Sequence, residues 1–298
     1  MTARAPRAGP ARMPQAGPAQ ILTTIRAECG EGPIVTQDGR ELLWVDILGR
    51  ELHRTSLADG KTSTFPVPCM IGAVAERASE GIVAAVAEGF AAIGDDGAYE
   101  PMCSFLGPGE RMNDAKCDAA GRFWSGSTAM DFTAGAGRLY VLHADWSWHC
   151  VLDGLTLPNG LGWSPDNRTF YLVDSRDHSL FAFNFDLSSG RLGPKRLLVR
   201  FRAEEGMPDG LTVADDGSVW VAVHGGGRVD VFSPDGGKLG QLPLPVRQPT
   251  SCAFDENGRL WVTSAWDGLP ERGASDDGGL FAVDVSGRTG PKAGVFAG

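Results

Sequence analysis

The chain repeats one short sequence pattern six times, and this repeat restricts its possible folds more than any other feature. One copy begins at 207–210, continues through a short apolar stretch to a turn at Gly217, and enters a second apolar run at 219–221. In the other copies, a different residue takes the position of Asp209, which we call the slot, and a turn residue usually follows eight positions later. The six slots are Glu31, Ile71, Asn113, Asn159, Asp209 and Thr250. The copy at Ile71, with Ser79 in the turn position, is the weakest.

The spacing of the slots predicts the architecture. Successive slots are separated by 40, 42, 46, 50 and 41 residues, and strand-turn-strand repeats of roughly 40–50 residues are typical of β-propeller blades. A single four-stranded sheet cannot bury both of its apolar faces, so such sheets pack against one another around an axis. We therefore predict an all-β, six-bladed β-propeller over residues 21–298. Its slot residues would form a ring at one mouth of the central channel.

The N-terminal segment looks different from the repeats. Residues 1–20 are rich in Ala, Pro, Gly and Arg, and we predict a disordered tail without the apolar core of a secretory signal. The next segment, Ile21 to Ile25, has a strand-like pattern. Because a propeller ring must be closed, we expect this segment to pair with residues 279–284 and complete the last blade.

Composition limits the partners of the chain. The formal net charge of −10 argues against nucleic acid and anionic membranes as partners. No apolar run approaches the ~20 residues that span a bilayer. The six cysteines include no C-x-x-C pair, and Cys117 and Cys252 are expected to be small buried hydrophobes. We expect a cytoplasmic protein that is a monomer or a weak homo-oligomer.

Four of the six slots carry oxygen ligands, which predicts a metal site. Two carboxylates and two amides would converge on the axis, whereas the five histidines lie outside the slots. Such oxygen-rich sets suit Ca²⁺, Mg²⁺ or Mn²⁺, and Zn²⁺ less naturally. Each of these residues is also a common turn former. Their shared position in the repeat favours a site, because two adjacent carboxylates repel one another unless a cation lies between them.

Four ordered motifs resemble those of the regucalcin/gluconolactonase family over residues 20–298. They are 29–33 (CGEGP), 111–118 (RMNDAKCD), 157–164 (LPNGLGWS) and 207–210 (MPDG). The resemblance implies a six-bladed propeller that holds one divalent cation and hydrolyses sugar lactones. It implies Glu31, Asn159 and Asp209 as metal ligands, and Arg111 and Asn113 as substrate contacts. A further substrate contact would be Asp131, in the segment 127–131, where the sequence departs from the usual family pattern and an insertion is expected.

These features predict a mechanism and leave two alternatives. A divalent cation, with calcium as the first choice and Mg²⁺, Mn²⁺ or Zn²⁺ as alternatives, would polarise the lactone carbonyl. Asp209 would both bind the cation and transfer protons. A phosphotriesterase-like hydrolase of the diisopropyl fluorophosphatase type would instead use Asn113 as a metal ligand. The other alternative is a non-catalytic calcium-binding propeller. Arg111 favours the lactonase, because a cation beside a metal is costly unless it holds an anionic or polyol substrate.

Overall fold

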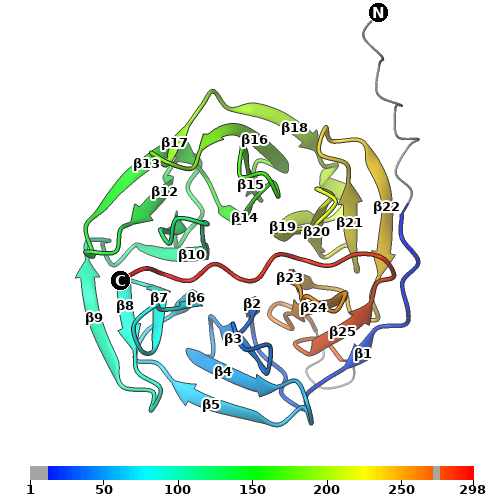
Figure 1. Ribbon diagram of the computed structural model, residues 1–298, viewed down its shortest axis with the longest axis horizontal. Coiled ribbons are helices and arrows are strands. Elements are labelled where there is room, and N and C mark those ends of the chain that lie inside the picture. The colour runs from blue at the N-terminus through cyan, green and yellow to red at the C-terminus, as the bar shows by residue number, and fades with distance from the viewer. Residues whose placement is uncertain (1–12, 271–275) are drawn as a thin grey trace, which may run out of the picture.

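A computed structural model describes residues 13–270 and 276–298, and it confirms the predicted six-bladed β-propeller (Figure 1). Six antiparallel sheets surround a central channel, and the first strand of each blade lies nearest the axis. Blade one contains β2 (Gly30–Val35), β3 (Glu41–Asp46), β4 (Glu51–Ser56) and β5 (Thr62–Pro66). Blade two contains β6 (Ile71–Glu76), β7 (Ile82–Val86), β8 (Gly89–Ile93) and β9 (Tyr99–Ser104). Blade three contains β10 (Glu110–Cys117), β11 (Phe123–Ala129), β12 (Gly137–Leu142) and β13 (Trp148–Leu155).

The remaining blades follow the same order around the axis. Blade four contains β14 (Pro158–Trp163), β15 (Thr169–Asp174) and β16 (Ser179–Asp186), with β17 (Arg191–Leu192) and β18 (Arg196–Arg200) both pairing with β16. A short 3₁₀ helix, η1 (Ala203–Glu205), precedes blade five. Blade five contains β19 (Met207–Val213), β20 (Val219–His224), β21 (Arg228–Phe232) and β22 (Lys238–Pro243). Blade six contains β23 (Pro249–Phe254), β24 (Arg259–Ser264), β25 (Leu280–Asp284) and β1 (Gln20–Ile21).

The turns between the first two strands of the blades explain the eight-residue rule. At five of the six positions the backbone has a positive φ: Gly39 (69°), Gly121 (81°), Asn167 (54°), Gly217 (83°) and Gly258 (87°). Glycine and asparagine adopt this conformation more readily than other residues. In the weakest copy, Ser79 is not the positive-φ residue; Gly81 takes that role with a φ of 83°. The spacing from Ile71 to the positive-φ glycine in blade two is therefore ten residues instead of eight, which is why this copy deviates in sequence.

Packing between blades buries the recurrent aromatic residues. Trp44, Trp124, Trp220 and Trp261 are at most 1% exposed, and each lies on the second strand of its blade. Cys117 and Cys252 are buried among apolar side chains, as the sequence predicted. Burial of large apolar side chains is the main favourable term in folding. The sheets are therefore fixed relative to one another close to the axis, which gives the channel a defined lining.

The ring is closed by the N-terminal segment, and the predicted pairing partner is right. The paired strand is β1, which is shorter than the predicted 21–25 and begins one residue earlier. In its register Ile21 lies opposite Phe281 of β25. Contacts with the propeller begin before residue 21, because the amide of Gly17 donates to the carbonyl oxygen of Asp284 at 2.8 Å. Residues 1–12 of the expected tail lie outside the described residues.

Removing residues 13–22 should lower the melting temperature of the protein by several degrees. The deletion exposes the hydrogen-bonding edge of β25 and uncovers the apolar residues that β1 and its approach segment cover. Differential scanning calorimetry of the full and truncated chains measures the effect. An unchanged melting temperature would show that β1 contributes nothing to ring closure.

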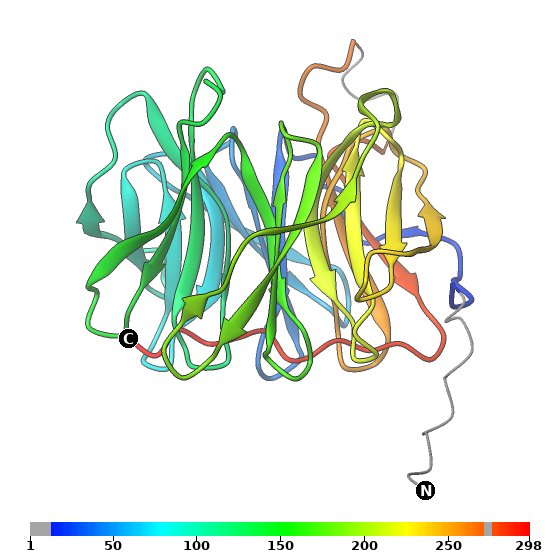
Figure 2. The same ribbon diagram turned by 90° about the horizontal axis from the view of Figure 1, so that it is seen from above.

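The C-terminal segment after β25 crosses the channel at the mouth opposite the slots (Figures 1 and 2). The slots lie near the beginnings of the first strands, whereas this segment contacts residues at or just after their ends. The amide of Asp215 donates to Thr289 O at 2.9 Å, and that of Phe296 donates to Glu76 O at 2.8 Å. Phe296 is fully buried. Only the slot end of the channel is therefore free of this segment.

No helix in the described parts of the chain is long and apolar enough to cross a membrane.

Candidate metal and substrate site

An irregularity in the first strand of every blade positions the slot residues. Each of these strands shifts register against its partner at or beside the slot. The shifts fall between Glu31 and Ile34, Ile71 and Ala73, Met112 and Ala115, Pro158 and Leu161, Pro208 and Leu211, and Pro249 and Ser251. A β-bulge interrupts the alternation of side chains and re-aims one of them, and such bulges are frequent beside active sites. The sequence repeat therefore corresponds to a repeated bulge around the channel.

Glycine after the slot lets the blades approach one another closely. A Cβ atom on Gly160 would overlap the amide nitrogen of Leu211 and lie 2.6 Å from the carbonyl oxygen of Asp209. A Cβ atom on Gly72 would likewise overlap the backbone of Asn113. Glycine occupies this position in four blades, but blade three has Asp114. Blade three thus places a third buried carboxylate at the ring, which the slot pattern alone did not predict.

The carboxylates of the ring are buried and repel one another. Glu31, Asp114 and Asp209 are 5%, 5% and 7% exposed. Burial, followed by the charges of Asp209 and Asp114, raises the pKa of Glu31 well above its ordinary value. Burial and the charge of Asp114 do the same for the pKa of Asp209. Burial raises the pKa of Asp114 to about 6, although the charge of Lys116 opposes this shift. A bound cation would offset the cost of ionising these groups.

Two oxygens of the ring lack hydrogen-bond donors. Asn159 Oδ1 and Asp209 Oδ1 are buried and accept no hydrogen bond within the described residues. The amide nitrogen of Asn159 donates to Ser175 Oγ at 3.2 Å, which orients the side chain. Glu31 Oε2 accepts from the amide of Gly32 at 3.0 Å. Buried oxygens without donors are costly alone but suit a hard cation.

The donor set therefore fits the predicted Glu31, Asn159 and Asp209 site. The ligands of this site would be the carboxylates of Glu31 and Asp209 together with the amide oxygen of Asn159. No three His, Cys, Asp or Glu side chains in the described ranges form a metal-binding group by themselves. This chemistry matches a cation that accepts neutral oxygen ligands, as calcium does.

Arg111 and Asn113 bond to each other beside the carboxylates. Arg111 Nη1 donates to Asn113 Oδ1 at 2.6 Å and to Met112 O at 3.0 Å. Asn113 Nδ2 donates to Pro158 O at 3.0 Å. The oxygen of Asn113 is therefore engaged by a guanidinium group, in contrast to the donor-free oxygen of Asn159. Burial lowers the pKa of Arg111, and the nearby Glu31 and Asp209 partly compensate.

The hydrogen bonds of the Asp131 side chain lie within its own turn. Asp131 is exposed in the turn after β11, where its Oδ1 accepts from the amide of Thr133 at 3.0 Å and from Thr133 Oγ1 at 2.7 Å. These hydrogen bonds lower the pKa of its carboxyl group. The side chain stabilises its own turn, and this turn lies in the segment where the sequence departs from the family pattern. The hydrogen bonds give no support to its expected role as a substrate contact.

Two aspartates outside the slots hold the segments that lead into the ring. Asp46 accepts from the amides of Glu28 at 2.7 Å and Cys29 at 2.9 Å. Asp174 accepts from the amides of Thr156 and Leu157, both at 2.9 Å. Each aspartate follows its slot, Glu31 or Asn159, by fifteen positions. The spacing of fifteen residues is visible in the sequence. The hydrogen bonds add that each aspartate positions the chain immediately before a slot.

Comparisons with known proteins agree with this fold. Residues 29–266 match the family model described as SMP-30/Gluconolactonase/LRE-like region. The chain is 33% identical to regucalcin of Gallus gallus, over 93% of this chain and 100% of that protein. It is 30% identical to the Bacillus subtilis protein YvrE, whose name classes it with sugar lactone lactonases, over 87% and 92% of the two chains.

Solved structures show the same architecture. A calcium-binding regucalcin from Agrobacterium tumefaciens superposes with a TM-score of 0.89 and 26% identity, covering 96% of this chain and 99% of that one. A luciferin-regenerating enzyme superposes with a TM-score of 0.87 and 26% identity, covering 95% and 99%. The family match spans most of the propeller and includes all six slots with the motifs around them. The chain therefore belongs to the SMP-30/gluconolactonase/LRE-like family.

Proposed function

We propose that this protein is a divalent-metal-dependent hydrolase that opens a sugar lactone to the corresponding sugar acid. Family membership supports a lactonase-like activity, since one relative is named as a sugar lactone lactonase. The observation that carries the proposal is the pair of buried, donor-free oxygens on Asn159 and Asp209, in the same ring as Glu31. These three residues would hold the cation. Calcium is the first choice, because the ligands are all oxygen and one structural relative is described as calcium-binding.

Different residues would carry out proton transfer and substrate binding in this reaction. When bound, the cation would supply Lewis acidity toward the lactone carbonyl and lower the pKa of water. The carboxylate of Asp209 accepts a proton from the attacking water and returns it to the ring oxygen that leaves. The guanidinium of Arg111 donates to the substrate hydroxyls or to the developing oxyanion. Asn113, held by Arg111 and Pro158 O, keeps that guanidinium in place.

The hydrogen bond between Arg111 and Asn113 also weighs against the phosphotriesterase-like alternative. That reading needs Asn113 Oδ1 as a metal ligand, but this oxygen accepts from Arg111 Nη1 at 2.6 Å. The substrate class can be tested with a panel of aldonolactones and a fluorophosphate, each assayed with Ca²⁺, Mg²⁺, Mn²⁺, Zn²⁺ or a chelator. We expect cation-dependent lactone hydrolysis and no comparable fluorophosphate hydrolysis. Cation binding without hydrolysis of any ester would instead support a non-catalytic calcium-binding propeller.

Stabilisation of the protein by the cation should increase with pH. The raised pKa values of Glu31 and Asp209 mean that the cation-free folded state keeps protons which the unfolded state has already released. Between the ordinary carboxyl pKa and the raised one, the cation-free protein therefore loses stability as pH rises. The cation binds the ionised form and reverses this loss, by about 2.7 kcal/mol at a hundredfold excess over Kd.

Melting temperatures with calcium and with chelator, measured from about pH 5 to about pH 8, check this prediction. We expect the difference between the two conditions to be small at the acidic end and to reach several degrees at the alkaline end. Parallel curves with and without calcium would show that these carboxylates do not bind the cation.

A further inference from the structure

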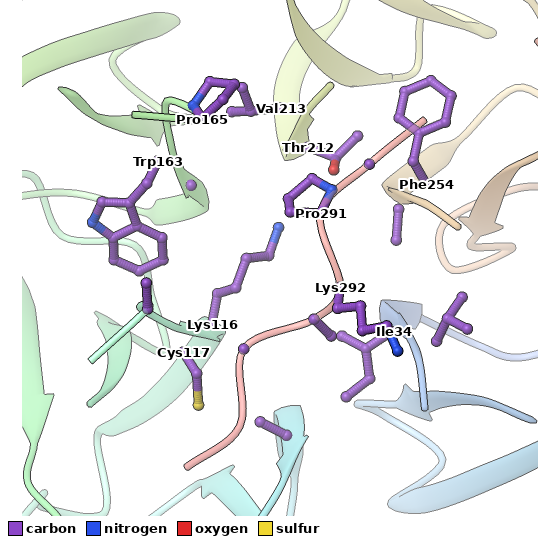
Figure 3. Close-up of a pocket in the computed structure, with 18 of the residues that line it drawn as sticks. Ile34, Lys116, Cys117, Trp163, Pro165, Thr212, Val213, Phe254, Pro291 and Lys292 are labelled. Atoms are coloured by element: carbon purple, nitrogen blue, oxygen red, sulfur yellow. The ribbon is translucent and has the colours of Figure 1, made fainter. Parts of the chain in front are cut away.

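A cavity, which we call the second cavity to distinguish it from the candidate site at the slot ring, lies in the channel at the mouth opposite the slots. It has a volume of about 360 Å³ and is lined by the later residues of the inner strands and by residues 290–294 of the C-terminal segment (Figure 3). A strand rises about 3.3 Å per residue. Because of the bulge, Glu31 and Ile34 lie opposite Val45 and Leu43, two residues apart, so Ile34 lies about 7 Å along the channel from Glu31. The cavity is therefore separate from the ring of slot residues. Pro291 and Lys292 are exposed, which places one edge of the cavity at the surface.

The walls of this cavity are mainly apolar. Ile34, Trp163, Val213 and Phe254 line it from four different blades. Small-molecule sites typically have volumes of 300–1,000 Å³ and apolar walls with a few polar groups that orient the ligand. A polyol in such walls would leave hydroxyl groups without partners. The chemistry thus differs from that of the carboxylate ring and does not suit a sugar.

One ammonium group stands inside this apolar lining. Lys116 extends from β10 toward Pro291 (Figure 3), and its Nζ donates to Leu211 O at 2.9 Å. An ammonium group has three donors, and this hydrogen bond uses one. Burial lowers the pKa of Lys116, and the charge of Asp114, two residues earlier in β10, partly opposes this shift. The other lysine of the lining, Lys292, is directed elsewhere, because its Nζ lies 3.5 Å from Glu256 Oε2 and donates to Gln37 O.

We propose that this cavity binds a small apolar monocarboxylate, with the carboxylate on Lys116 Nζ and the apolar body against Trp163, Val213 and Phe254. The ion pair would form among mainly apolar side chains, and hydrogen bonds between charged groups are stronger than those between neutral ones. The aliphatic and aromatic walls exclude water from the body of the ligand. This site is independent of the lactone chemistry proposed above.

Calorimetric titration with 3-phenylpropanoate tests the proposal, with 3-phenylpropanamide as the uncharged analogue. We expect saturable binding of the acid, and about tenfold weaker binding of the amide, because a hydrogen bond between charged groups is lost. Lys116→Met should weaken binding of the acid by a similar factor. The matched variant Lys292→Met should leave it unchanged. Val213→Phe should abolish binding by filling the cavity, and its melting curve shows whether the variant folds.

Three results would overturn the proposal. They are the absence of saturable binding, equal affinity for the acid and the amide, and an affinity that does not change in Lys116→Met. Arg111→Met locates the ligand within the channel. If this change at the slot ring removed binding, the acid would occupy the candidate lactone site and the second cavity would have no role. Unchanged binding in Arg111→Met, together with loss in Lys116→Met, assigns the ligand to the second cavity.

Discussion

Asp209→Asn should reduce kcat/KM for lactone hydrolysis by a factor of about 10³ or more. General acid–base catalysis alone contributes roughly 10²–10⁴, and the same change weakens the cation site. The amide has nearly the shape of the carboxylate, so the channel should remain intact. Because the pKa of Asp209 is raised by burial and by Asp114, its ionised form destabilises the cation-free protein. The variant should therefore melt at an equal or higher temperature than the parent in chelator, while losing both calcium affinity and turnover.

The matched control for this experiment is Asp131→Asn. The carboxylate of Asp131 is exposed and bonded to Thr133 in its own turn. Substitution of an exposed side chain away from buried polar networks usually has a small effect, so we expect turnover within about twofold of the parent. Steady-state kinetics and calorimetry with calcium measure both variants. Full activity in Asp209→Asn would remove this residue from the mechanism. A large loss in Asp131→Asn would restore the role that the family resemblance suggested for it.

Gly160→Ala should destabilise the protein by about 3 kcal/mol, the upper part of the usual range for overpacking. The new Cβ atom would overlap the amide nitrogen of Leu211 and lie 2.6 Å from the carbonyl oxygen of Asp209. Both atoms belong to the backbone of the neighbouring blade, which cannot move aside as a flexible side chain can. Since the clash falls beside Asp209, calcium affinity should also decrease.

Gly109→Ala is the control, because a Cβ atom there would meet no atom within 4 Å. We expect this variant to stay within about 0.5 kcal/mol of the parent. Urea denaturation of both variants, with chelator present, measures the difference in the free energy of unfolding. Equal stabilities for the two variants would show that the blades do not need glycine after the slot.

The repeat in the sequence was sufficient to predict the blades, because each copy carries its own strand and turn signals. The turn at Gly217 and the strand containing Trp220 have the conformation and burial that their sequence indicates. Ring closure followed from topology, since the last blade needs a strand from the other end of the chain. The exact limits of β1 did not follow, because two paired residues leave almost no pattern in a sequence.

The candidate site was less predictable, because its properties arise between blades. A pattern of slots cannot show that Asp114 contributes a buried carboxylate, or that Asn113 is occupied by Arg111 whereas Asn159 Oδ1 has no donor. Nor does it show that Asp131 bonds within its own turn. The cavity around Lys116 depends on the C-terminal segment, whose path across the channel has no local sequence signal. Contacts of this kind are set by tertiary structure alone.

The most direct test of the central claim is the anomalous scattering of Mn²⁺ in a crystal of the protein. The cation-site proposal predicts one strong peak in the channel, within roughly 2.1–2.5 Å of oxygens from Glu31, Asn159 and Asp209, which is lost in Asp209→Asn. A channel without a peak at these residues, or a peak whose ligands lie elsewhere in the molecule, would contradict it.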